Sequence, residues 1–261
     1  MWWRLILVSS ALLLFPGFWQ GIAALRSRLV VTYAFIGTIV AMHWLAFYGS
    51  IKLSNASVAA TCMAMAPLFV AFIEPVIVGR RFDRRELFFG IAVVPGVALV
   101  VGGIPAEMRT GLAVGVLSAL LAAVFGTLNK RYIEHGGALT VTGLEMMSGA
   151  VCVTTIGVAL PTLTMFVKPA AHDAVLLLVL AIACTLVPFA LSLVAQRHLS
   201  AFTTALAVNM EPVYAIALAI VLLGEQHELS PGFYLGVVIV LAVVFSHPLW
   251  LPESLKNGSI R

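Results

Sequence analysis

The sequence predicts an all-α membrane protein, a polytopic bundle of about nine transmembrane helices arranged as two inverted-topology repeats. Three observations predict this fold: an apolar composition, a series of long apolar runs, and an uneven distribution of Lys and Arg between alternate loops. The chain is 62% hydrophobic and 10% charged, whereas a soluble domain has about 25% charged residues. A bilayer tolerates such a composition, and the continuous apolar runs favour helices over a barrel of alternating strands.

A helix needs about 20 apolar residues to cross a bilayer. Polar, Gly or Pro breaks divide the chain into nine such runs, which are 2–19, 29–50, 56–78, 87–104, 110–129, 139–160, 174–194, 201–223 and 232–250. The segment 251–261 is a polar tail. An alternative for residues 1–20 is a signal peptide, but this segment ends in Phe18, Trp19 and Gln20, which make a poor cleavage site.

The basic residues are shared unequally between the two sides of the predicted membrane. One set of alternate loops, with the tail, holds eleven Lys and Arg, and the other set holds four, including Arg4, so that eleven and four give the fifteen in the chain. Because cytoplasmic loops are the positive ones, we expect the C-terminus to be cytoplasmic. The net charge of +4 is then explained by the basic loops that set the membrane topology. It does not require a nucleic-acid partner.

An internal repeat relates residues that are 145 positions apart. Ala56 corresponds to Ala201, Met65 to Met210, Pro67 to Pro212, and Gly79 to Gly224. The repeat predicts a first unit at 1–104, with four helices and the first helix of its unit missing, and a second unit at 110–250 with five. Five is odd, so the two units insert in opposite orientations, as in many secondary transporters.

Ionisable groups inside a membrane are costly and are candidate site residues for that reason. Glu211 lies in the middle of the run 201–223, with Asn209 and Tyr214 beside it. Pro212 leaves a backbone carbonyl free one turn back, so Pro212 and its repeat equivalent Pro67 are predicted hinges. The alternative for Glu211 is a carboxyl that is hydrogen-bonded for packing alone.

Two further candidates lie in other runs. His43 and Trp44 precede Phe47 and Tyr48 by one helical turn, a spacing that gives an aromatic face able to stack on a ring or cover a cation. Glu145 lies near the middle of 139–160. Packing without a binding role is the alternative for both. Glu74 lies toward the cytoplasmic end of its run, where its side chain can extend toward Arg80 or Arg81.

The ordered set of these features resembles a known family. Glu211-Pro212 followed by Gly224-Glu225, and the segment from His43 through Ala60 to Pro67, are similar to helices of the EamA repeat of the drug/metabolite transporter superfamily. The resemblance implies ten helices in two inverted repeats and export or exchange of amino acids, drugs or other metabolites. The chain departs from it in having Gly79-Arg80 where the second repeat has Gly224-Glu225, and in lacking one helix.

We therefore expect a secondary transporter of a bacterial-type inner membrane, with substrate-binding residues His43, Trp44, Tyr48, Glu145, Asn209, Glu211 and Tyr214. Its expected partners are a small-molecule substrate, the lipid bilayer, protons and a second copy of the chain. A non-transporting membrane scaffold or truncated paralogue is the alternative. No sequence motif for an intramembrane enzyme, a cofactor or direct use of ATP is present. Cys62, Cys152 and Cys184 lie in apolar runs and do not predict a metal site.

Overall fold

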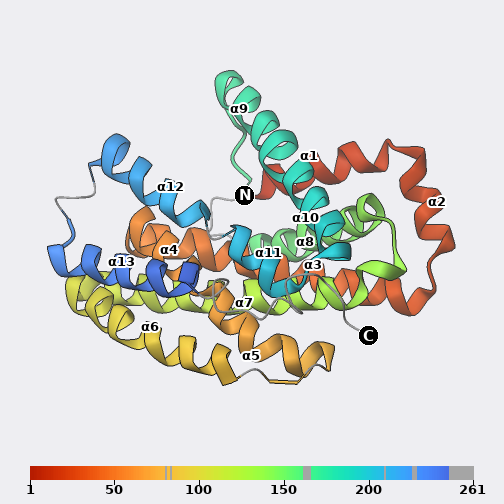
Figure 1. The fold of residues 1–261 in the computed structure, drawn as a ribbon. Coiled ribbons are helices and arrows are strands. Elements are labelled where there is room, and N and C mark those ends of the chain that lie inside the picture. The colour runs from red at the N-terminus through yellow and green to blue at the C-terminus, as the bar shows by residue number, and fades with distance from the viewer. Residues whose placement is uncertain (80, 83, 161–165, 209, 225–227, 247–261) are drawn as a thin grey trace. The chain divides into compact units, whose positions relative to one another are not determined.

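The fold is all-helical throughout the described residues (Figure 1). It was obtained as a computed structural model, which describes residues 1–79, 81–82, 84–160, 166–208, 210–224 and 228–246. The polar tail 251–261 lies outside these residues. The prediction of an all-α polytopic bundle is confirmed.

The helices follow one another with short connections. The α-helices are α1 (Trp2–Leu13), α2 (Pro16–Ala24), α3 (Ser27–Leu53), α4 (Ala56–Met63), α5 (Ala66–Val78), α6 (Arg84–Gly103), α7 (Arg109–Tyr132), α8 (Ala138–Ala159), α9 (Ala171–Ala181), α10 (Val187–His198), α11 (Ala201–Val208), α12 (Met210–Leu218) and α13 (Pro231–Ser246). Two short 3-10 helices, η1 (Ala106–Met108) and η2 (Ile133–His135), and two π-helical segments, η3 (Ile182–Leu186) and η4 (Ala219–Leu223), join or extend them.

Within the described ranges, five helical segments are long and apolar enough to cross a bilayer, or six if a bent pair at the N-terminus forms one span. The five are Ser27–Leu53, Ala56–Val78, Ala106–His135, Ala138–Ala159 and His172–His198. The predicted run 87–104 corresponds to α6, and 232–250 corresponds in its described part to α13. The described part of the run 201–223 contains α11, α12 and the π-helical segment η4, and Asn209 between α11 and α12 lies outside the described residues.

The predicted single helix at 2–19 is wrong in one respect, because the structure divides it into α1 and α2. The two helices are bent by 84°. Pro16 explains the break: a proline disfavours helical backbone at the residue before it, and Phe15 is extended, with φ −91° and ψ 114°. Pro16 itself then begins α2, a position where its missing N–H has no cost.

The chain forms two compact units, and each takes segments from both halves of the sequence. Unit 1 consists of Met1–Trp44 and Leu128–Arg197, and unit 2 of Leu45–Thr127 and His198–Arg261. The two segments of unit 1 correspond through the 145-residue repeat, since 1–44 plus 145 gives 146–189. Each compact unit therefore combines related parts of the two repeats.

In unit 1, α8 packs against both α1 and α2. The approach is close: a Cβ at Gly143 of α8 would overlap the ring of Phe18 of α2, and one at Gly21 would overlap Thr140. Trp2 of α1 donates a 2.8 Å hydrogen bond from Nε1 to the Thr154 hydroxyl of α8. Small residues and one indole bond therefore fix α1 and α2 on α8.

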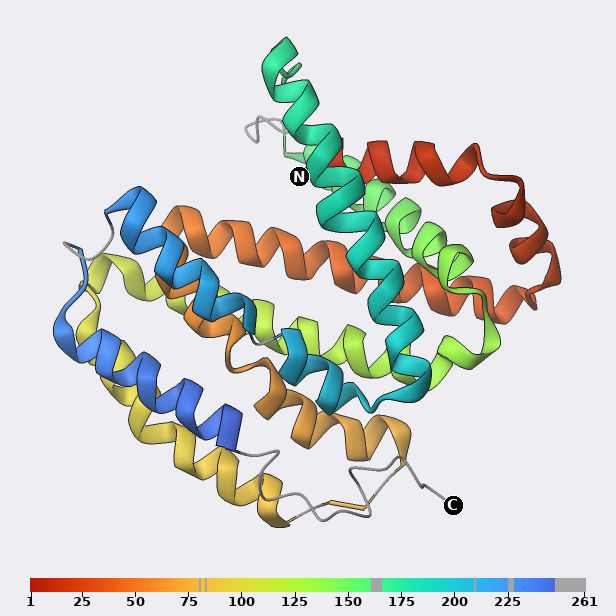
Figure 2. The same cartoon turned by 45° about the horizontal axis from the view of Figure 1, so that its top comes forward.

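In unit 2, α6 and α13 lie side by side along their length (Figure 2). A Cβ at Gly236 would lie 2.6 Å from the Gly96 carbonyl oxygen, so both glycines are required at this crossing. In addition, α4 packs against α12, and α5 packs against α11. Apolar side chains such as Val58, Ile216 and Phe233 form the core under these helices.

Candidate functional site

Within unit 1, the side chain of Arg4 lies over Trp44, one ring of the predicted aromatic face of α3. The Arg4 guanidinium of α1 lies 3.9 Å from the centre of the Trp44 ring, and Arg4 is only 6% exposed. His43, the neighbour of Trp44, is also buried. Arg4 was counted in the sequence as a topology charge, whereas the structure places it with two predicted site residues. Its partner lies 40 positions away, so no local signal could have indicated the contact.

Glu145 of α8 lies in the interior of unit 1 beside Asn129 of α7. The Asn129 side-chain amide donates a 3.3 Å hydrogen bond to Glu145 Oε2. Both side chains are fully buried. Asn129 was not a candidate in the sequence analysis. The sequence does contain a signal for this contact. Asn129 and Glu145 lie about equally far from the turn at Gly137, and residues at such positions face each other across two antiparallel helices.

The remaining described candidates belong to unit 2. Glu211 and Tyr214, one turn apart on α12, are both exposed, Tyr214 by 61%. Tyr48 on α3 lies at the surface of the unit, and its ring meets Phe47 edge to face at 5.7 Å between centroids. Asn209 lies outside the described residues. The side chains of Glu211 and Tyr214 are thus exposed on α12.

One of the two predicted hinge prolines lies next to a described helix break. Pro67 is near the start of α5, directly after the break at Ala64 and Met65 that ends α4. Pro212, its repeat equivalent, lies within α12. Asn209, the position before α12, lies outside the described residues.

Unit 2 also contains two carboxylates that connect the two repeats. Each accepts a hydrogen bond at the start of a helix of the other repeat. Glu74 of α5 is buried, and its Oε1 accepts a 3.2 Å hydrogen bond from the Ala201 backbone N–H at the start of α11. Glu228 accepts a 3.0 Å bond from the Asn55 side chain at the start of α4. The contact of Glu74 with α11 was not predicted, because the sequence indicated only the neighbouring arginines.

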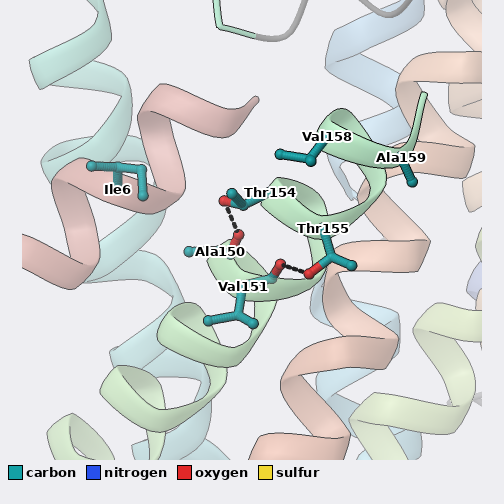
Figure 3. Close-up of a pocket in the computed structure, with 7 residues that line it drawn as sticks. All are labelled: Ile6, Ala150, Val151, Thr154, Thr155, Val158 and Ala159. Carbon is teal, nitrogen blue, oxygen red and sulfur yellow. Dashed lines mark hydrogen bonds between the residues drawn. The ribbon is translucent and has the colours of Figure 1, made fainter. Parts of the chain in front are cut away.

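A pocket of about 530 Å³ lies on unit 1 between α1 and α8 (Figure 3). Its lining is apolar, because the Thr154 and Thr155 hydroxyls donate to the carbonyls of Ala150 and Val151, at 2.7 and 2.9 Å. The pocket is lined by Ile6, Ala150, Val151, Thr154, Thr155, Val158 and Ala159. None of these seven is a predicted site residue. An apolar depression of this kind suits lipid chains better than a charged metabolite.

The residues that the structure describes contain no cluster of three His, Cys, Asp or Glu side chains that could hold a metal ion.

Comparison with known proteins places the chain in a family. The search of curated proteins finds no match. A solved structure whose title reads only "Crystal structure of protein" has the same fold, with a TM-score of 0.66 and 14% sequence identity over 98% of this chain and 88% of that chain. The model of the EamA-like transporter family matches twice, at residues 1–102 and 109–246. Since these matches cover most of the sequence, the chain belongs to the EamA-like transporter family, and it is a membrane transporter protein by family rather than an enzyme.

Proposed function

We propose that the chain is a secondary transporter that exports or exchanges a small metabolite, such as an amino acid or drug-like compound, by alternating access. The membrane is the cytoplasmic membrane of a bacterium, with the C-terminus on the cytoplasmic side. The family supports transport in general. The positive loops support the orientation.

The observation that carries the mechanism is the interrupted helix of unit 2 in the run 56–78. This run breaks at Ala64 and Met65, between α4 and α5. Discontinuous helices are typical of transporter binding sites, because the broken turn presents free backbone groups and half-helix dipoles to the substrate. Pro67, directly after this break, and its repeat equivalent Pro212 are the proposed hinges.

The proposed substrate contacts are named for each unit by itself. In unit 2, Glu211 and Tyr214 on α12 are exposed, as a substrate contact requires, and Tyr48 and Asn209 are further proposed contacts. In unit 1 the proposed contacts are His43, Trp44 and Glu145. Glu211 is the strongest member, because it is an exposed carboxylate in the middle of an apolar run, directly before the proposed hinge Pro212.

The test is a metabolite profile of the medium from cells that overproduce the chain. We expect one compound class to accumulate with the native chain and to fall to the level of empty cells with Glu211→Ala. Glu134→Ala serves as the control, because Glu134 is an exposed carboxylate on η2. Amounts of protein in the membrane are matched by quantitative immunoblot.

Two results would contradict the proposal. If the native chain and empty cells give the same medium, the chain does not export under these conditions and the scaffold alternative is favoured. If Glu211→Ala exports as well as Glu134→Ala does, transport stands but the proposed site at Glu211 is wrong.

A further inference from the structure

The pair of Glu145 and Asn129 has an unusual balance of hydrogen-bonding groups. Glu145 is 0% exposed and Asn129 is 1% exposed. The amide Nδ2 donates to Glu145 Oε2 at 3.3 Å. Glu145 Oε1 and Asn129 Oδ1, the second oxygen of each group, are buried without a hydrogen-bond partner among the described residues. Buried polar atoms without a partner are rare, so this pair requires an explanation.

One added proton would satisfy the pair. An ionised carboxylate only accepts hydrogen bonds, so with Glu145 charged both unpartnered atoms are acceptors and no donor lies between them. A single buried charge with one amide partner is also costly, by several kcal/mol. A proton on Oε1 removes the charge and turns that oxygen into a donor for an acceptor such as Oδ1. The result holds for either orientation of the amide, because an amide oxygen turned toward the carboxyl also needs an acid as its donor.

We propose that Glu145 and Asn129 form a proton-binding site in the interior of unit 1. The carboxylate takes a proton from water and becomes a neutral acid, and on release the proton returns to water; no other bond forms or breaks. This site deepens the proposed function, on which its role rests, by naming Glu145 as the carrier of the coupling proton. Neither oxygen of the pair is then required to bind the substrate directly.

The ionisable groups on the helices around Glu145 are engaged with other partners. Tyr33 of α3 donates to the Tyr132 carbonyl at 2.7 Å, and Lys130 of α7 donates to the Gln196 carbonyl at 2.6 Å. The further groups are Arg197 of α10, which donates to the Gly136 carbonyl at 2.7 Å, Arg4 of α1, which lies over Trp44, and His43 of α3; α2 has no charged residue. The interaction of Glu145 with Asn129 is thus the polar contact that defines this site.

The protonation state of Glu145 has a direct route to α3. A Cβ at Gly37 of α3 would overlap the Glu145 carbonyl oxygen, the Glu145 Cα and the Ser148 hydroxyl. The backbone at Glu145 is therefore in tight contact with α3, the helix that carries His43 and Trp44. When the proton leaves, the unpaired charge favours a new arrangement of Glu145, and a close-packed contact transmits such a change rather than absorbing it.

The test measures the protonation of Glu145 by infrared spectroscopy on the full chain in phosphatidylcholine vesicles, with H⁺ and D⁺ as probes. We expect a C=O stretching band of a neutral carboxylic acid, which shifts in D₂O and fades reversibly as the pH is raised. The band should be absent in Glu145→Gln and unchanged in Glu211→Gln. In Asn129→Leu it should move to higher frequency, because the carboxyl carbonyl loses its hydrogen bond.

The outcomes separate this inference from the transporter proposal, because the infrared measurement needs no transported substrate. A band that remains in Glu145→Gln, or one that neither exchanges nor titrates, overturns the proton site. If Glu145→Gln does not fold, the band position in Asn129→Leu decides instead. With a proton site established, export of the compound found above should depend less on the pH gradient in Asn129→Leu than in the native chain, and unaltered dependence would reject the coupling role alone.

Discussion

Two runs of unit 2, 56–78 and 201–223, have a similar backbone at both ends and differ in where they carry a carboxylate. Both begin with a side-chain cap, and both end at a glycine in the left-handed region, Gly79 with φ 82° and Gly224 with φ 72°. Yet Glu74 is buried near the end of the first run, whereas Glu211 is exposed near the middle of the second.

The comparison teaches that the repeat preserves the signals for the backbone and leaves the side chains free to diverge. The residue equivalent to Glu211 in the first run is Ala66, which is buried, and the residue equivalent to Glu74 in the second run is Ala219, also buried. The carboxylates of the two runs therefore have different roles: Glu74 joins the repeats through the Ala201 N–H, and Glu211 is proposed to meet the substrate.

The largest effect should follow from giving the first run the carboxylate of the second. Ala66→Glu buries an unpartnered charge near the middle of a run, and we expect it to lower the free energy of unfolding by about 3 kcal/mol. The reverse change, Glu211→Ala, should alter it by less than about 0.5 kcal/mol, because the side chain is exposed. Detergent unfolding followed by circular dichroism measures both. Ala66→Leu controls for bulk, and a stable Ala66→Glu would contradict the burial difference.

Removing the carboxylate that joins the repeats should have the next largest effect. Glu74→Leu leaves the Ala201 N–H at the start of α11 without its acceptor, and a hydrogen bond to a charged group contributes about 2 kcal/mol. Glu74→Gln retains an acceptor oxygen and should lose less. The same unfolding measurement applies, and equal stability of the leucine variant and the native chain would show that the contact with α11 contributes nothing.

The fold was largely predictable from the sequence, because long apolar runs and a repeat are signals that survive without tertiary information. The break before Pro16 was missed, since the run 2–19 is apolar throughout and its hydrophobicity outweighed one proline. The exposed Glu211 and the buried Glu145 looked alike in the sequence. Their difference arises from packing by helices distant in the chain, as does the position of Arg4 over Trp44.

Alanine at the two left-handed glycines should have smaller and nearly equal effects. A Cβ at Gly79 or at Gly224 would meet no atom within 4 Å, so the cost is the backbone conformation alone. We expect Gly79→Ala and Gly224→Ala each to lower the free energy of unfolding by about 1 kcal/mol. Gly→Asn at either position should cost less, since Asn tolerates this conformation. A large difference between the two alanine variants would mean that the ends of the runs are not equivalent.

Effects of about the same size as those of the glycine variants should come from the two caps, which are 145 positions apart. The Asn55 side chain accepts from the Val58 N–H, and the Ser200 hydroxyl accepts from the Thr203 N–H, each at 3.0 Å. Replacing such a cap by alanine costs about 1 kcal/mol, so Ser200→Ala should lose this amount.

Asn55→Ala should lose more than Ser200→Ala, because Asn55 also donates to Glu228 across the repeats. A double-mutant cycle with Glu228→Ala, which removes the acceptor, isolates that second bond, since the excess should disappear when Glu228 is already changed. If the excess remains in the Glu228→Ala background, the bond to Glu228 does not explain it, and the two caps would differ for a reason local to each helix.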